Sequence, residues 1–236
     1  MKKSNFEKFP EIKIEGYACT AGWNGINEKI LAEINSSKKD KVLVVIECYQ
    51  GVFTDEIIKN VKTIFGVTRV VDSKEALLSP DEIDKMVQQY VTEDPVFGYI
   101  SPLSLPDFFD TKKLTALQEE LSSGDNGITV IVGTGASLMS PDADLRIYAD
   151  MPRWEIQLRF RDNKVSNLGV ENKEAEFSYQ YKRAFFVDWR VCDRYKKNTM
   201  PSSDFSLDTT IPGEPKMVSG EAIREALQKT TKRPFR

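Results

Sequence analysis

Short runs of apolar, mostly β-branched residues recur along the chain, and segments with apolar residues at helical spacing separate them. Such continuous runs are typical of strands that are buried on both faces of a sheet. The four clearest runs predict strands at residues 42–46, 67–71, 128–132 and 145–149, and a fifth strand is expected near residues 205–207.

The segments between these runs predict helices. Ser79, Asp110 and Ser219 stand where helix N-caps are expected, and Thr54 is a further candidate cap. Strands that alternate with helices predict an α/β fold with a parallel sheet and helices on both faces. Ligands of such sheets bind beyond the carboxyl ends of the strands, so the residues that follow each strand are the ones to examine.

The composition excludes several kinds of chemistry. The 236 residues include no histidine and three cysteines, Cys19, Cys48 and Cys192. Ser-His-Asp and Cys-His catalytic groups are therefore impossible, and we expect no zinc in this chain. Any reaction would use carboxylates, cationic side chains, hydroxyl groups or a hard cation such as Mg²⁺.

Three features together predict a cytoplasmic protein with no membrane partner. The cysteines are odd in number and widely spaced, which disfavours a disulfide framework. No apolar run approaches the roughly 18 to 20 residues that span a bilayer. The first ten residues include three lysines and one glutamate, which is not the pattern of a signal peptide.

The charge is unevenly distributed. The formal net charge is −3, yet residues 151–200 hold eleven Lys or Arg and seven Asp or Glu. A basic segment on an acidic body favours a small anionic ligand over nucleic acid. A mixed, solvated surface is the alternative interpretation of this feature.

The turn after the first predicted strand stands where a P-loop would lie. A P-loop reads G-x-x-x-x-G-K-S/T, and its lysine reaches the β- and γ-phosphates. Here Gly51 occupies the position of the second glycine, but Phe53 occupies the position of the lysine or the one next to it. The turn and the following helix N-terminus could still bind an anion, and a plain strand-to-helix turn is the alternative. The candidate phosphate- or nucleotide-binding residues of this turn are Tyr49, Gln50, Gly51, Val52 and Thr54.

Two other strand ends carry candidate site residues. Gly133 and Gly135 follow the strand at 128–132, where glycine allows the backbone to approach a ligand closely. A tight turn would explain the same glycines. Asp72 ends the strand at 67–71, where a carboxylate could hold Mg²⁺ or accept a hydroxyl proton. Capping of the following helix is the commoner role of such an aspartate.

Cationic side chains mark a further candidate region. Arg153, Arg159 and Arg161 lie in the helix predicted at 151–161, and arginine binds phosphate groups in a bidentate manner. Arg159 and Arg161 point to different sides of a continuous helix, so surface positions are the alternative. Farther on, residues 182–195 interleave aromatic and cationic side chains, which is typical of a core element with charged flanks or of an interface.

Residues 42–165 resemble the uridine-kinase-like branch of the P-loop kinases. The resemblance lies in the order of the elements and in the stretches 106–111 and 145–162. It implies a three-layer, P-loop-kinase-like parallel sheet, with Asp72 as catalytic base and Arg159 and Arg161 as lid arginines. The sequence departs from that pattern in lacking the P-loop lysine and an acidic residue after the third strand. Kinase chemistry is therefore the less expected use of this fold.

Five strings resemble the N-terminal region of long bacterial class I mannose-6-phosphate isomerases. In that family a kinase-like domain precedes a zinc-dependent, cupin-type isomerase domain. Because the zinc ligands of the family include histidine and this chain has none, isomerase activity is not expected here. The five strings are residues 94–98, 148–159, 167–169, 185–190 and 232–236.

The domain organisation expected from these resemblances is simple. Residues 1–40 form an N-terminal extension with one helix, and residues 41–236 form a degenerate P-loop kinase-like domain. Within that domain, a lid region spans about residues 151–200 and the last helix spans 219–231.

The leading functional hypothesis is a non-catalytic kinase-like domain that accompanies a mannose-6-phosphate isomerase and binds a sugar phosphate, or a nucleotide with Mg²⁺. Its expected partner is the isomerase catalytic domain, in the same chain or another, or a second copy of this chain. One alternative is an active phosphotransferase of uridine-kinase type that uses Lys59, Arg153 or Arg159 in place of the missing lysine. The other is a protein-interaction module centred on residues 182–195.

Overall fold

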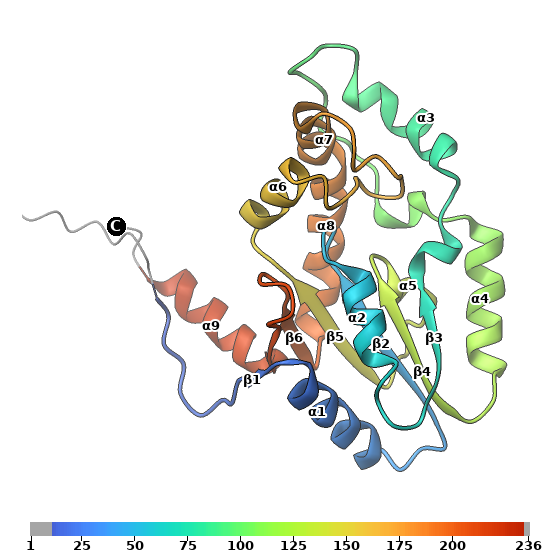
Figure 1. Ribbon diagram of the computed structural model, residues 1–236, viewed down its shortest axis with the longest axis vertical. Helices are drawn as coiled ribbons and strands as arrows, with labels where there is room; N and C mark the ends of the chain where they lie inside the picture. The colour runs from blue at the N-terminus through green and yellow to red at the C-terminus, as the bar shows by residue number, and fades with distance from the viewer. Residues whose placement is uncertain (1–10, 234–236) are drawn as a thin grey trace, which may run out of the picture.

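A seven-stranded mixed sheet runs through the molecule (Figure 1). The computed structural model describes residues 11–233, so residues 1–10 of the expected extension and residues 234–236 of the last string lie outside the described residues. The strand order is β1-β7-β6-β5-β2-β4-β3. The strands are β1 (Thr20–Ala21), β2 (Lys41–Cys48), β3 (Val67–Asp72), β4 (Gly127–Gly133), β5 (Leu145–Asp150), β6 (Phe205–Asp208) and β7 (Lys216–Ser219).

The five strands that the sequence predicts form the parallel part of this sheet. Strands β2 to β6 pair in parallel, and the registers bring Glu47 level with Gly133 and Asp72 level with Val132. The turn after β2, Asp72 and Gly133 therefore meet at one edge of the sheet. After β2 the chain continues to β3 on one side, and after the adjacent strand β4 it continues to β5 on the other side. The carboxyl ends of β2 and β4 therefore form a topological switch point.

The prediction of a wholly parallel sheet is wrong for two strands. β7 pairs with β6 in the antiparallel sense, and β1 pairs with β7 in the same sense. Only seven residues join β6 to β7, and a parallel return would need a crossover of a dozen or more. Both strands are too short, at four residues and two residues, to produce an apolar pattern of their own.

Most helices begin where the sequence predicts. Asp110 accepts hydrogen bonds from the amides of Lys112 and Lys113, and Ser79 and Ser219 also accept bonds from their helices. Thr54 is not a cap, because Phe53 occupies that position. The main helices are α1 (Trp23–Ser36), α2 (Thr54–Val61), α3 (Pro80–Val91), α4 (Thr111–Ser123), α5 (Ala136–Met139), α6 (Arg153–Arg161), α7 (Phe177–Arg183), α8 (Trp189–Thr199) and α9 (Gly220–Lys232).

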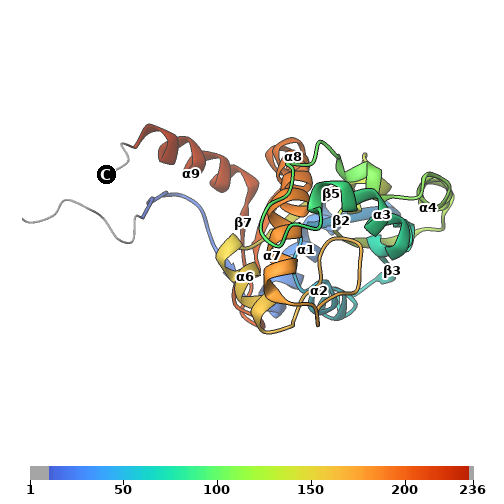
Figure 2. The same ribbon diagram turned by 90° about the horizontal axis from the view of Figure 1, so that it is seen from above.

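The helices pack around the sheet and close its core. Figure 2 shows α1 and α2 on one side of the sheet and α8 on the other. Helix α1 buries Ile26, Ile30 and Ile34 in the same core as the strands, so residues within the expected N-terminal extension belong to this packing. Among residues 11–233, no helix is long and apolar enough to cross a membrane.

A turn of π-helix, η3 (Ala184–Asp188), joins α7 to α8 and makes one long helical rod from the three. This rod contains the segment 182–195 that interleaves aromatic and cationic residues. Trp189 and Arg183 are fully buried, and Lys182 is buried as well. The segment is therefore mainly a core element, and its π-turn is a feature that often accompanies functional sites.

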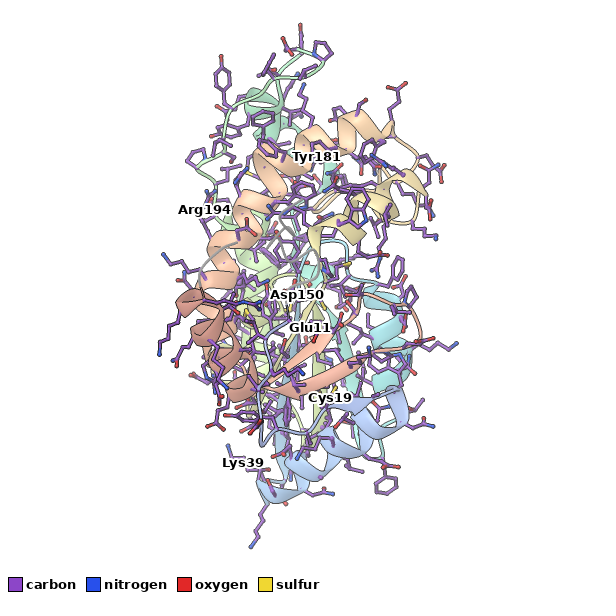
Figure 3. The ribbon with its side chains drawn as sticks, turned by 90° about the vertical axis from the view of Figure 1, so that its left-hand side faces the viewer. Glu11, Cys19, Lys39, Asp150, Tyr181 and Arg194 are labelled. Carbon is purple, nitrogen blue, oxygen red and sulfur yellow. The ribbon has the colours of Figure 1, made fainter. Side chains whose placement is uncertain are left out.

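The long axis of the molecule follows the strands. In Figure 3, Lys39, which directly precedes β2, lies near one end of the molecule, and Tyr181 of α7 lies toward the other. Asp150, the last residue of β5, lies between them. Helix α7 and the loops around it thus lie beyond the carboxyl ends of the parallel strands, and α8 continues from there along one face of the sheet (Figure 1 and Figure 2).

Candidate functional site

A cleft of about 390 Å³ opens at the carboxyl ends of β2, β3 and β4. This is large enough for a small ligand. The turn after β2, the end of β3, the start of the loop after β4 and the loop 164–173 all line it. Six of the residues predicted from the sequence lie together here: Gln50, Gly51, Val52, Thr54, Asp72 and Gly133. The other five, Tyr49, Gly135, Arg153, Arg159 and Arg161, do not line this cleft.

Two amides of the turn after β2 form hydrogen bonds within the turn. The Val52 amide donates to the Tyr49 carbonyl at 3.1 Å, and the Thr54 amide donates to the Val52 carbonyl at 2.9 Å. Gly51 has φ 93°, and a Cβ atom there would lie 2.9 Å from Cγ2 of Ile156. The glycine is thus required by the tight approach of α6, and the Val52 and Thr54 amides are already used within the turn, whereas a P-loop directs its amides at phosphate.

Arg159 closes the back of this turn. Its guanidinium donates to the carbonyl oxygens of Gly51 at 2.9 Å and Thr209 at 2.8 Å, and its Cζ lies 3.9 Å from the centre of the Phe53 ring. Glu155, one helical turn earlier, accepts from its Nε. Since only 2% of Arg159 is exposed, this side chain holds three segments of the protein together.

Tyr49, Arg153 and Asp193 form a separate cluster beside the rod. The Tyr49 hydroxyl donates to Oδ1 of Asp193 at 2.7 Å, and Arg153 forms an ion pair with the same carboxylate at 2.7 Å. The Arg153 guanidinium also stacks on the Trp189 ring. Burial is the main cause that raises the pKa of the Tyr49 phenol. Arg161 lies apart from this cluster, with its guanidinium over the ring of Phe177.

Asp72 has the role of a cap at the end of β3. Its Oδ1 accepts a hydrogen bond from the Lys74 amide at 2.9 Å. The Asp72 amide in turn donates to Oε1 of Glu75 at 3.3 Å. Ser73 donates to the Thr134 carbonyl across the cleft floor. A Cβ atom on Gly133 would lie 2.1 Å from the Ser73 hydroxyl, so the glycine permits this close contact. Asp72 still lines the cleft while it caps the 3₁₀ turn η1 (Ser73–Ala76).

Three lysines line the cleft, and no local pattern in the sequence connects them. Lys74 follows β3, whereas Lys164 and Lys173 lie on the loop between α6 and α7. All three are exposed, and among the described residues Lys74 and Lys173 form no ion pair. Lys164 has an exposed ion pair with Asp162, which contributes little. Cations from two distant parts of the chain therefore face one space.

The loop that carries Lys164 and Lys173 is held from below by buried polar side chains. Asn167 donates to Oδ2 of Asp188 at 2.6 Å, and the Leu168 amide donates to the same oxygen. Gln180 donates to the carbonyl oxygens of Val165 and Asn172. The string at 167–169 therefore has a structural role, because Asn167 and the Leu168 amide bind Asp188 of the π-turn.

Asp188 lies at the centre of this network. Burial raises the pKa of its carboxyl group, and Arg183, whose Nε lies 3.6 Å from Oδ1, acts in the opposite direction. Arg183 also pairs with Asp84 and donates to the Leu168 carbonyl. The string at 185–190 therefore includes the side chain that fixes the cleft loop to the rod.

Gln50 connects the turn after β2 to the same loop. Its Oε1 accepts from the Trp189 indole at 3.2 Å, and its Nε2 donates to the Ser166 carbonyl at 2.9 Å. Only 3% of Gln50 is exposed. The side chain fixes the width of the cleft rather than presenting its amide to a ligand.

The lining charges are mixed. Besides the three lysines, the carboxylates of Asp55, Asp72 and Glu171 line the cleft. Among residues 11–233, no three His, Cys, Asp or Glu side chains group closely enough to hold a metal ion. The combination of cations and carboxylates suits a ligand that has both a phosphate group and hydroxyl groups.

The chain was compared with known proteins. A search of the curated proteins found no match. A family model described as a domain of unknown function, DUF8485, matches residues 22–232. The match includes every strand except the first, the cleft and the whole rod of α7 and α8. Since it covers most of the chain, the protein belongs to the DUF8485 family.

Proposed function

We propose that this protein is a non-catalytic, three-layer, P-loop-kinase-like domain that binds a sugar phosphate or a nucleotide in the cleft described above. The observation that carries the proposal is the convergence of Lys74, Lys164 and Lys173 at the carboxyl ends of the parallel strands. Ligands of open α/β sheets bind at this edge, and lysine is a common phosphate ligand.

The mixed lining favours a phosphorylated sugar or nucleotide over a bare anion. The lysines would pair with the phosphate, and Asp55, Asp72 and Glu171 would accept hydrogen bonds from hydroxyl groups. If the ligand is a nucleotide with Mg²⁺, Asp55 and Asp72 are the carboxylates that would face the ion.

The residues that stand at the kinase positions are already held by other contacts, which argues for ligand binding without phosphoryl transfer. The turn has no lysine, and Phe53 lies under the guanidinium of Arg159. Asp72 caps its own 3₁₀ turn, and Arg159 is committed to backbone carbonyls. A phosphoryl group in the cleft would therefore lack the positioned cation of a working P-loop.

Calorimetric titration tests this proposal. Mannose 6-phosphate, ATP, GTP and UTP at millimolar concentration are the probes, with and without Mg²⁺. We expect one of them to bind, and Lys164→Ala with Lys173→Ala to weaken that binding at least about tenfold. Lys62→Ala, an exposed lysine outside the cleft, is the matched control. The absence of heat with every probe, or equal weakening by the control, would refute the proposal.

A second candidate is an active phosphotransferase, favoured by the position of Asp72 at the cleft wall. A screen with radiolabelled ATP over nucleosides and sugars decides between the two. Turnover that Asp72→Asn abolishes, while Asp107→Asn leaves it unchanged, would replace the binding proposal with this one. Asp107 is a suitable control because it lies outside the cleft and accepts a hydrogen bond from the Ser104 amide at the start of a different 3₁₀ turn.

A partner role with a mannose-6-phosphate isomerase catalytic domain rests on the sequence resemblance. The exposed side chains favour the segment 96–100 as the contact region, rather than residues 182–195. In this segment Phe97 is 71% exposed and Tyr99 is 69% exposed. Co-purification with such a catalytic domain is the test. The expected result is loss of the complex in Phe97→Ser with Tyr99→Ser, whereas retention of the complex in that variant would refute this surface.

A further inference from the structure

A second cavity of about 560 Å³ lies apart from the phosphate cleft and shares no lining residue with it. Residues of β2 and β5 form its sheet wall, and α4, α5, α8 and the 3₁₀ turn η4 (Met200–Ser202) supply the remainder. Its polar lining includes Glu47, Ser137, Tyr148 and Tyr195, beside apolar residues such as Leu114. One basic side chain, Arg146, lines it, and Arg146 donates to the Pro141 carbonyl.

Glu47 is the unusual member of this lining. Only 3% of its surface is exposed, and it forms no ion pair among the described residues. Its Oε1 accepts from the Gly135 amide at 2.6 Å and its Oε2 accepts from the Ser137 amide at 2.8 Å. The Ser137 hydroxyl group also lies within reach of this carboxylate. Because a carboxylate has about four acceptor positions, capacity remains for a ligand donor. A buried carboxylate without a counter-ion is costly in a domain that has no use for it.

Tyr148 supplies an independent observation. It is 3% exposed and lines the cavity, and within residues 11–233 its hydroxyl group forms no hydrogen bond. This hydroxyl oxygen is not among the fully enclosed polar atoms that lack a partner, so it is accessible from the cavity. Tyr195 stands across the same space from Glu47, with its hydroxyl group near Ser137. Two tyrosines and a carboxylate thus line one cavity.

We propose that this cavity binds a small organic cation, such as an alkylammonium or guanidinium group, whose N–H donors reach the Glu47 carboxylate. The Tyr148 and Tyr195 rings would cover its carbon atoms, because aromatic faces attract cations. The bound cation supplies the counter-ion that Glu47 lacks. This site is independent of the phosphate cleft, so either one can fail in experiment without the other.

The proposal predicts that binding depends on pH. Burial raises the pKa of Glu47 to about 7, against the opposing effect of the Ser137 and Gly135 amides. The other titratable groups around it are Cys48 of β2, Tyr148 of β5 and Cys192 and Tyr195 of α8, and burial raises the pKa of each, so none of them ionises near pH 7. The cationic side chains nearby are Arg146 of β5, in the lining, and Lys196 of α8, which lies over the Tyr148 ring. A cation binds the ionised carboxyl group, so affinity should fall about tenfold from pH 8 to pH 6, with proton release at pH 6.

Calorimetry with ethylammonium chloride and guanidinium chloride, at low millimolar concentration, provides the test. We expect saturable binding of at least one cation at pH 8 and about tenfold weaker binding at pH 6. Titration at pH 6 in two buffers of different ionisation enthalpy reports the released proton. Binding that does not change with pH, or propanol that binds as tightly as the cations, would overturn the proposal, as would the absence of binding at pH 8.

Two variants and one control locate the site. Glu47→Gln should abolish cation binding, and its fold is checked by circular dichroism because two amides depend on this side chain. Tyr148→Phe leaves those amide bonds intact and should weaken binding about fivefold through loss of one hydrogen bond. Glu171→Gln, an exposed carboxylate of the phosphate cleft, is the control. Unchanged cation affinity in Tyr148→Phe, or equal loss in Glu171→Gln, would contradict this assignment.

Discussion

Two buried charged side chains lie near the carboxyl ends of the parallel strands, and their surroundings determine how each charge is compensated. Arg159 and Glu47 are both charged and nearly inaccessible, yet their surroundings differ. Arg159 has carbonyl oxygens, a carboxylate and an aromatic ring around its guanidinium, and the carboxylate opposes the burial that lowers its pKa. Glu47 has two amides and no cation among the described residues, so its charge is poorly accommodated near neutral pH.

The raised pKa of Glu47 predicts a specific dependence of stability on pH. The carboxyl group has a pKa of 4.5 in the unfolded chain and about 7 in the fold. Between these values the folded state keeps a proton that the unfolded state has lost, so stability falls as pH rises through this window. The free energy of unfolding should be lower at pH 8 than at pH 5 by about 2 kcal/mol from this group.

Urea unfolding at both pH values, for the natural protein and for Glu47→Gln, measures this contribution. The variant should lose that part of the pH dependence, because its side chain does not titrate. An identical difference between pH 5 and pH 8 in the two proteins would show that Glu47 is not its source.

Arg159 should not tolerate the usual basic replacement. Lysine keeps the charge but has no planar fork, so Arg159→Lys loses the bonds to the 209–210 carbonyls and the stack on Phe53. We expect a loss of about 2 to 3 kcal/mol in the free energy of unfolding, measured with urea. Arg161→Lys, two residues away and exposed, is the matched control and should change it by less than about 0.5 kcal/mol.

At the scale of elements, the rod of α7, η3 and α8 positions the loop that faces the cleft at the carboxyl ends of β2, β3 and β4. The π-turn brings Asp188 under Asn167 and the Leu168 amide, and Trp189 reaches Gln50 of the β2 turn. Both walls of the cleft are therefore fixed to one helix. A loop so attached is pre-organised, which lowers the ordering cost of binding a ligand.

Loss of the Asp188 charge should loosen this loop while the sheet stays intact. Asp188→Asn leaves Arg183 with weaker compensation and removes one acceptor from the network. We expect faster amide hydrogen exchange at residues 165–172 and unchanged exchange in β2. Asp193→Asn, on the exposed side of the same rod, is the control, and similar exchange profiles for the two variants would contradict this role of Asp188.

At the scale of the whole molecule, segments far apart in the chain complete one sheet and one core. β1, from residues 20–21, pairs with β7 near the other end of the chain, and α1 packs against α2. The Trp23 indole donates to Glu56 of α2, and Asn27 donates to the Asn60 carbonyl. Residues before β2 thus contribute to the stability of the sheet.

Removal of residues 1–40 should therefore abolish cooperative folding of the remainder. It would expose the surface that Ile26, Ile30 and Ile34 cover, at a cost of about 2 to 5 kcal/mol for each isoleucine, against a typical total stability of about 5 to 15 kcal/mol. Thermal unfolding followed by circular dichroism is the measurement. Lys29→Ala, on the exposed side of α1, should unfold almost as the natural protein does. A sharp transition in the shortened chain would refute this dependence.

The sequence by itself determined the class of fold and the positions of most elements. Buried parallel strands need continuous apolar runs, and helix N-caps need side chains such as Asp110 and Ser219, so both leave local patterns. The short strands β1 and β7 left none. The order of strands also brings the candidates Gly51, Asp72 and Gly133 to one edge, as expected of residues that follow parallel strands.

Only the tertiary structure decided which side chains meet. Lys74 and Lys173 are about a hundred residues apart, and nothing in their local sequence indicates a common cleft. Arg159 reads as a surface or lid arginine but is buried, because a helix face is selected by packing and not by the charge of one residue. The carboxylate of Glu47 shows the same limit. Its position directly after the predicted strand at 42–46 was visible, whereas its lack of a counter-ion depends on the helices that fold over it.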